Sequence, residues 1–121
     1  MPKILLVEDE LKMVENLKKA FIAKGYEVVV AMTGTDALVL YPKENPDVVL
    51  LDLGLPDMNG RDVLKDIKSK TPQLKVVVVS GYGEKTVEAE LLSLGADYFL
   101  SKPVFPPKLF AVLNEVFNKP K

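Results

Sequence analysis

The stretch Val48–Gly60 (VVLLDLGLPDMNG) carries an acidic residue in a position that could support chemistry. Asp52 follows an unbroken apolar run, which is typical of a parallel strand buried on both faces. The segment 54–60 is rich in Gly, Pro, Asp and Asn, so we expect a loop there. Asp52 would then stand at the carboxyl end of a strand, where open α/β sheets bind ligands. Taken alone, Asp52 is explained equally well as a residue that starts a turn or caps the next helix.

Polar side chains also follow other apolar runs of the chain. Glu8 and Asp9 follow the first run, Ser80 the fourth and Lys102 the fifth. Because the strands of a parallel sheet end at one edge, we expect these groups to meet Asp52 there. Each has an ordinary explanation by itself: acids before a helix, a turn serine, a solvated surface lysine. Their joint occurrence at the strand ends of one sheet is hard to attribute to solvation.

The chemistry of these groups is complementary. Neighbouring carboxylates raise one another's pKa unless a cation joins them. An all-oxygen site suits Mg²⁺, or Mn²⁺ as a substitute. A carboxylate beside such a metal can attack phosphorus and form an acyl phosphate. A lysine would neutralise charge on the transferring phosphoryl group, and a serine hydroxyl could donate a hydrogen bond to it. The pattern therefore predicts phosphoryl transfer to a carboxylate.

Composition excludes several other classes of function. The chain has 121 residues, which suits one domain, and 16 basic against 17 acidic residues, which give no basic field for nucleic acid. It has no Cys, which removes disulfides and thiolate chemistry and fits a reducing cytoplasm, and no His for metal ligation or base catalysis. We expect no signal peptide and no contact with a membrane, because no apolar run approaches membrane-spanning length.

Five apolar strands alternating with amphipathic helices must position these groups. The expected strands are Lys3–Val7, Tyr26–Ala31, Val48–Leu51, Leu74–Val79 and Asp97–Leu100. The expected helices are a first one ended by Gly25, a short Ala37–Tyr41 broken by Pro42, then Arg61–Lys70, Glu84–Leu94 and one opened by Pro106. This order predicts an α/β fold with a parallel sheet, right-handed crossovers and helices on both faces. We also expect Glu8 and Asp9 to lie in the acidic first turn of the first helix, and Glu27 to mark an edge strand.

Four motifs resemble those of the receiver domains of two-component response regulators, in particular single-domain chemotaxis-type receivers, and the likeness covers essentially the whole chain. They are ILLVEDE (4–10), LLDLGLPDMNG (50–60), VVVSGYG (77–83) and GADYFLSKP (95–103). The resemblance implies a flavodoxin-like, doubly wound (βα)5 three-layer sandwich with strand order 2-1-3-4-5. It implies one receiver domain over residues 1–121, and we expect no output domain in this chain.

The resemblance also implies roles for the site residues. Asp52 would accept phosphate from a histidine kinase or a histidine phosphotransfer protein. Asp9, Asp52 and the Gly54 carbonyl would bind Mg²⁺ directly, with Glu8 acting largely through water. Lys102 would contact the phosphate, ahead of a cis peptide at Pro103. The protein would catalyse nothing beyond its own phosphorylation and dephosphorylation.

Similarity to the family further implies a conformational switch. Ser80 would move toward phosphorylated Asp52 and draw in the loop 81–83, and Phe99 would rotate inward. The face of the fourth helix, fifth strand and fifth helix would then change and contact an unknown downstream protein or a second copy in a homodimer. Tyr98, Phe110 and Val112 are candidate contacts there. A packed-core role explains those residues equally well, and without the resemblance it is the preferred role for Phe99.

Three departures from the family pattern bear on kinetics. Gly54 lies where the family often has a larger side chain, so attacking water is less hindered. Phe99 lacks the hydroxyl of a tyrosine, and Tyr82 could partly cover the site.

Two other classes stay open. A Mg²⁺-dependent hydrolase with an aspartate nucleophile would also use Asp52, but it would need a second acid where Gly54 stands. A phosphate-independent binding module would not need the full set of acids, serine and lysine.

Overall fold

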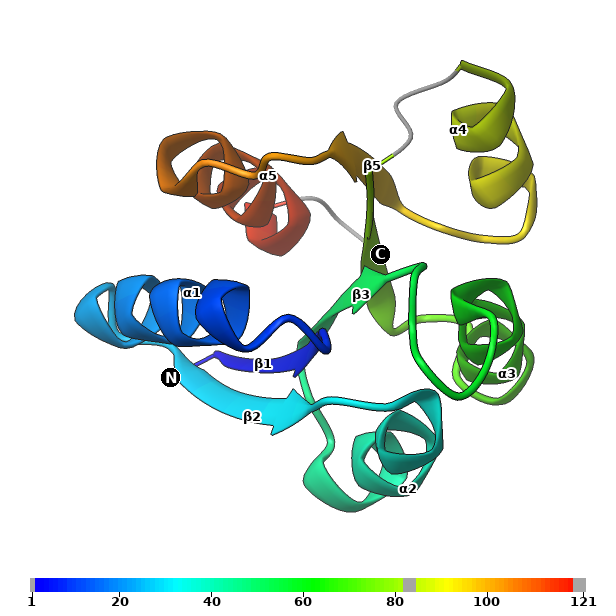
Figure 1. Ribbon diagram of the computed structural model, residues 1–121, viewed down its shortest axis with the longest axis horizontal. Coiled ribbons are helices and arrows are strands. Elements are labelled where there is room, and N and C mark those ends of the chain that lie inside the picture. Colours follow the sequence, from blue (N-terminus) through cyan, green and yellow to red (C-terminus); the bar gives the residue numbers. More distant parts are fainter. Residues whose placement is uncertain (1, 82–84, 119–121) are drawn as a thin grey trace.

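The computed structural model describes residues 2–81 and 85–118, which form a parallel sheet covered by helices on both faces (Figure 1). In chain order the elements are β1 (Lys3–Val7), α1 (Leu11–Ala23), β2 (Glu27–Ala31), α2 (Gly34–Glu44), β3 (Val48–Asp52), α3 (Gly60–Lys70), β4 (Lys75–Ser80), α4 (Lys85–Ser93), β5 (Tyr98–Ser101) and α5 (Pro106–Asn118). The predicted alternation of strands and helices is confirmed.

The strand order is β2-β1-β3-β4-β5, the flavodoxin-like order that the family resemblance implies. All neighbouring strands pair in parallel; Leu6 lies opposite Leu50, and Asp52 lies opposite Val79. The central strands are the uninterrupted apolar runs, because both of their faces are covered. The edge strand β2 begins with the exposed Glu27, as predicted.

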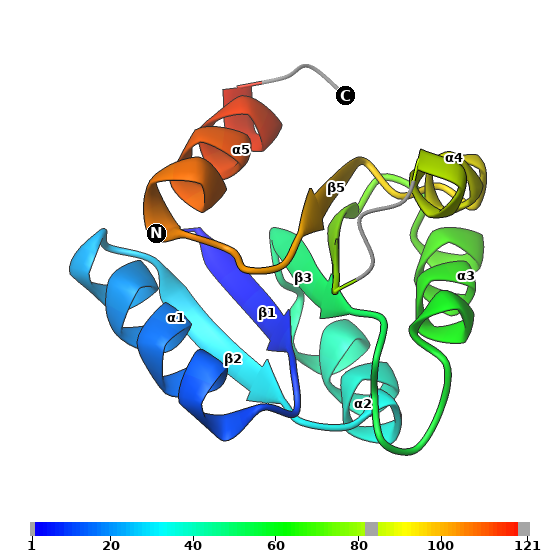
Figure 2. The same ribbon diagram turned by 45° about the horizontal axis from the view of Figure 1, so that its top comes forward.

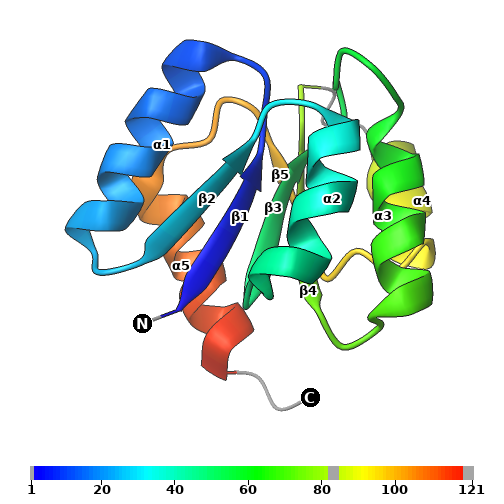
Figure 3. The ribbon, with the colours of Figure 1, turned by 90° about the horizontal axis from the view of Figure 1, so that it is seen from below.

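Two hydrophobic cores lie on the two faces of the sheet. Helices α1 and α5 cover one face, and α2, α3 and α4 cover the other (Figure 3). Successive side chains of β1 alternate between the cores: Leu5 packs with the α3 residue Leu64, whereas Ile4 packs with Phe21 of α1 and Leu113 of α5. The sheet is therefore fixed from both sides, and its carboxyl edge is held in place.

Two local predictions were wrong. The acids after β1 do not form the first turn of α1, because the helix begins at Leu11 after Glu10 as its N-cap residue. This leaves Glu8 and Asp9 at the sheet edge. Pro42 does not break the second helix, which continues to Glu44. A proline near a helix end removes one hydrogen bond only, and here the buried Tyr41 and a left-handed cap at Asn45 (φ 49°) still define the last turn.

Other expectations about helix ends are met. Gly25 follows α1 with φ 91°, a left-handed conformation that glycine adopts without strain. Among the described residues, no helix combines the length and apolar character needed to span a bilayer.

Candidate functional site

The predicted polar groups meet at the carboxyl edge of the sheet. Glu8 and Asp9 directly follow β1, Asp52 ends β3, Ser80 ends β4 and Lys102 follows β5. The strand arrowheads in Figure 2 end along this one edge. The convergence predicted from parallel strands is therefore present.

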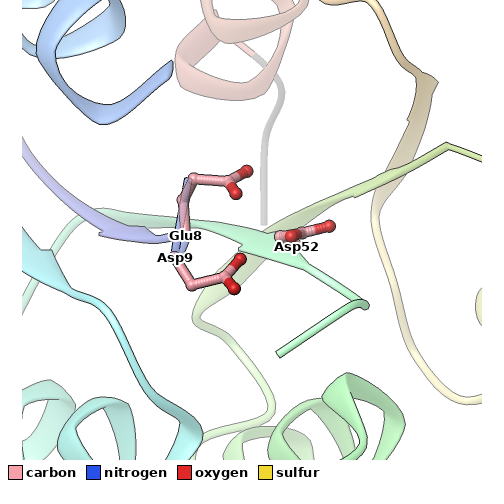
Figure 4. A group of neighbouring side chains, drawn as sticks. All are labelled: Glu8, Asp9 and Asp52. Atoms are coloured by element: carbon pink, nitrogen blue, oxygen red, sulfur yellow. The ribbon is translucent and has the colours of Figure 1, made fainter. Parts of the chain in front are cut away.

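Three of these residues form a carboxylate cluster. One oxygen from each of Glu8, Asp9 and Asp52 lies within 4.8 Å of the others. Their carboxyl groups project into the same space from the ends of β1 and β3 (Figure 4). Glu8 is 1% exposed and Asp52 5%, whereas Asp9 is open to solvent. The site therefore has a buried floor and an accessible side.

Lys102, which directly follows β5, pairs with two of the carboxylates. Its Nζ lies 3.3 Å from Oε1 of Glu8 and 3.4 Å from Oδ2 of Asp52. Its backbone N–H donates a hydrogen bond to the carbonyl of Ser80 (2.8 Å), which fixes the start of the β5–α5 connection against β4. The peptide bond to Pro103 is cis, as expected.

Burial and charge perturb the acid and the lysine in linked ways. Burial raises the pKa of Glu8, and the charge of Asp52 raises it further. A hydrogen bond from the Glu10 N–H and the charge of Lys102 lower the pKa, but they do not cancel the rise, so the pKa of Glu8 is raised. Burial alone would lower the pKa of Lys102, but the charges of Glu8 and Asp52 outweigh it and raise the pKa. Lys102 thus stays a cation beside the two acids.

The donor set fits a hard divalent cation. The clustered ligand atoms are all carboxylate oxygens, and the chain has no His or Cys that would favour zinc. A cation would also offset the burial and the charge of Asp52, which raise the pKa of Glu8. The residues therefore suit Mg²⁺ by chemistry and by electrostatics.

A pocket of about 870 Å³ opens over Asp52 and is lined by the loop after β3, by Ser80 and by Lys102. The Gly54 N–H lies 3.3 Å from Oδ1 of Asp52. A Cβ atom at Gly54 would lie 3.9 Å from Oδ2 of Asp52, in ordinary contact. The space that a larger side chain would occupy is therefore directly beside the carboxylate.

Other predicted residues lie away from the carboxylates. Phe99 is half-buried and packs against the core beneath α4. Phe110 is half-buried; it packs edge-on against Phe21 (6.0 Å between ring centroids) and stacks on Tyr26 (6.4 Å). Tyr82 and most of the loop 81–83 lie outside the described residues.

Two interactions near the site were missed by sequence reasoning. Asp57 accepts hydrogen bonds from Gly34 and Thr35 at the start of α2. Arg61 of α3 pairs with Glu90 of α4 through two hydrogen bonds of 2.9 and 3.0 Å. The Pro-Asp pair of the loop signals only a turn, and no local pattern identifies partners 23 and 29 residues away.

These features define a class: a flavodoxin-like sheet with an acidic, lysine-bridged site at its carboxyl edge. The response regulator receiver domain family matches residues 4–114, so the chain belongs to this family. Receiver domains accept a phosphoryl group on an aspartate, and they bind Mg²⁺ at an acidic pocket. In this chain Glu8, Asp9 and Asp52 form an acidic cluster at the carboxyl edge of the sheet.

Similar proteins agree with this assignment. The chain is 35% identical over 115 residues to the chemotaxis protein CheY of Thermotoga maritima, covering 94% of this chain and 96% of that one. It is 37% identical over 119 residues to the transcriptional regulatory protein KdpE of Mycobacterium tuberculosis, covering 98% of this chain but only 52% of KdpE. The non-phosphorylated HemR receiver domain from Leptospira biflexa matches with a TM-score of 0.93 and 32% identity, covering 100% of this chain and 98% of that one.

Proposed function

We propose that Asp52 is the phosphoacceptor and that residues 1–121 act as one receiver domain. A carboxylate oxygen of Asp52 attacks the phosphorus of a phosphohistidine on a histidine kinase or histidine phosphotransfer protein. The P–O bond forms as the P–N bond breaks, and the imidazole leaves with the electron pair. The observation that carries this proposal is the position of Asp52: buried, accessible from the pocket, and in contact with Lys102.

The surrounding residues have distinct proposed roles. Glu8, Asp9, Asp52 and the Gly54 carbonyl would hold Mg²⁺, with Mn²⁺ as a substitute and Glu8 acting largely through water. Bound metal would supply positive charge to the transferring phosphoryl oxygens. Lys102 would leave Glu8 for the phosphoryl group, and Ser80 would donate a hydrogen bond to it. Slow attack by water on the acyl phosphate would return Asp52 to its free form.

The signal would leave through α4, β5 and α5. Ser80 lies opposite Ser101 in the β4–β5 pairing, and Phe99 lies opposite Val78 on the core side below α4. A shift of Ser80 toward the phosphoryl group would move the paired end of β5 and change the packing around Phe99. Phe99 would then turn inward by packing alone. The changed face would contact a downstream protein or a second copy, with Tyr98 and Val112 as proposed contacts.

Phosphorylation by a small donor tests the proposal. We expect the protein incubated with Mg²⁺ and acetyl phosphate to gain one phosphoryl group in intact mass spectrometry, and the Asp52→Asn variant to gain none. No gain in the wild type, or a persistent gain in Asp52→Asn, would contradict it. Rapid turnover of phosphoesters without a stable adduct would instead identify a hydrolase.

A further inference from the structure

The β3–α3 loop (residues 53–60) is closed at its base. The carbonyl of Leu53 accepts hydrogen bonds from the N–H groups of Leu55 (3.0 Å) and Gly60 (3.2 Å). The Leu53 N–H donates to the carbonyl of Val79 in β4 (3.2 Å). The two ends of the loop are thereby held together and against the sheet.

The tip of the same loop is fastened to α2 by Asp57. Its Oδ1 accepts from the Gly34 N–H (2.7 Å), and its Oδ2 accepts from the N–H (2.9 Å) and hydroxyl (2.6 Å) of Thr35. These N–H groups belong to the first turn of α2, where helix geometry leaves them without partners and the dipole favours an anion. The same hydrogen bonds lower the pKa of Asp57 to about 2, so the carboxylate stays ionised at neutral pH.

Packing prevents this tip from sliding along α2. Met58 lies so close to Gly34 that a Cβ atom on Gly34 would overlap its side chain. Gly34 is buried, whereas its neighbours Thr35 and Asp36 are exposed. The loop tip is therefore held against the start of α2 by two contacts, a charged one at Asp57 and an apolar one at Met58.

Gly54 lies on the short segment between these two anchors. Only Leu55, whose N–H bonds to the base, and Pro56, whose φ is fixed, separate Gly54 from the fastened Asp57. The Gly54 N–H already faces the Asp52 carboxylate. The Leu55 N–H, which closes the base on Leu53, belongs to the same peptide unit as the Gly54 carbonyl, so a displacement of the tip would act on this peptide next to the acidic cluster.

We propose that Asp57 is a positioning residue for the phosphorylation site: by fastening the loop to α2, it orients the Gly54 carbonyl toward the cation held by Glu8, Asp9 and Asp52. This inference rests on the proposed function, since it assumes that the acidic cluster binds Mg²⁺. In this proposal Asp57 acts through the loop and the Gly54 carbonyl, not as a ligand of the cation.

Calorimetric titration of the unphosphorylated protein with MgCl₂ tests the role of Asp57 without any activity assay. We expect Asp57→Asn to raise the Kd for Mg²⁺ about tenfold, as loss of residues that orient metal ligands commonly does. The matched control is Asp36→Asn, which removes an exposed acid from the first turn of the same helix without touching the loop. Its Kd should stay within about twofold of the wild type.

The unfolding free energy of each variant is measured alongside. Equal destabilisation of the Asp57 and Asp36 variants with an unchanged Kd would show that Asp57 is only a helix cap, and would overturn the inference. A wild type that binds no Mg²⁺ would contradict the proposed function itself, a distinguishable result.

A milder variant keeps the inference testable if Asp57→Asn does not fold. Thr35→Ala removes the hydroxyl bond to Asp57 and leaves the two backbone bonds in place. Loss of one such bond should raise the Kd about threefold. An unchanged Kd in a folded Thr35→Ala protein would overturn the inference.

Discussion

At the residue scale, the metal-free protein disfavours the ionised form of Glu8. Its pKa is raised mainly by burial and also by Asp52, even though Lys102 attracts its ionised form. A raised acid pKa means that the folded state binds more protons than the unfolded state as the pH rises above 4.5, the ordinary value. The metal-free protein therefore loses stability with rising pH at this residue.

Replacing Glu8 by glutamine should relieve this cost. In EDTA near neutral pH, we expect Glu8→Gln to raise the unfolding free energy by on the order of 1 kcal/mol. The gain should shrink as the pH falls toward 4.5, because the wild-type side chain then becomes neutral as well. Denaturant unfolding at several pH values measures it. The exposed Glu15→Gln serves as control, and a destabilised Glu8→Gln would contradict the electrostatic account.

Gly54 lies beside the carboxylate of the proposed phosphoacceptor. Because a Cβ atom there would lie 3.9 Å from Oδ2 of Asp52, a longer side chain can cover the carboxylate against water. We expect Gly54→Met to slow loss of the phosphoryl group about tenfold, which corresponds to roughly 1.4 kcal/mol of barrier. Intact mass spectrometry after removal of acetyl phosphate gives the rate. An unchanged rate in a fully phosphorylated variant would contradict this role.

At the element scale, the junction of β3 and α3 has no room for a side chain. A Cβ atom at Gly60 would lie 2.7 Å from the Leu53 Cα and 2.9 Å from the Asp52 carbonyl oxygen. We expect Gly60→Ala to lower the unfolding free energy by about 1–3 kcal/mol. The control Gly54→Ala adds the same methyl group in open contact and should change it by no more than about 0.5 kcal/mol. Equal effects in chemical denaturation would contradict the close approach.

The elements themselves were largely predictable from the sequence. Buried parallel strands require apolar runs, so Val48–Asp52 and its counterparts could be recognised within a residue or two. The end of α2 could not, because the local signal of Pro42 is outweighed by the buried Tyr41 and by the cap at Asn45. Tertiary packing determines where α2 ends, and a short window of sequence does not reveal that packing.

At the scale of the whole molecule, the site joins segments far apart in the chain, so a bound cation should stabilise the entire fold. At a Mg²⁺ concentration 100 times its Kd, we expect about 2.7 kcal/mol of stabilisation over EDTA. Asp9→Asn should remove most of this gain while leaving the metal-free stability near that of the wild type, because Asp9 is exposed. Thermal unfolding measures both. An equal loss of the gain in the exposed Asp62→Asn would contradict a localised site.

The topology of the whole molecule determines which parts of the site could be predicted from the sequence. Parallel strands bring their carboxyl ends together, so the sequence was enough to place Glu8, Asp52 and Lys102 on one edge of the sheet. The contact between Asp57 and α2 depends on the path of a loop across the molecule. Aspartate and threonine form local turns so readily that their long-range pairing has no sequence signature.

In the phosphorylated protein we expect the phosphoryl group to reside on Asp52. Borohydride reduces an acyl phosphate to an alcohol, so the phosphorylated protein can be reduced, digested and mapped by peptide mass spectrometry. We expect the reduced residue at Asp52 alone, in the peptide that carries β3. Reduction at Glu8, at Asp9 or at any other residue, with Asp52 unchanged, would contradict the account.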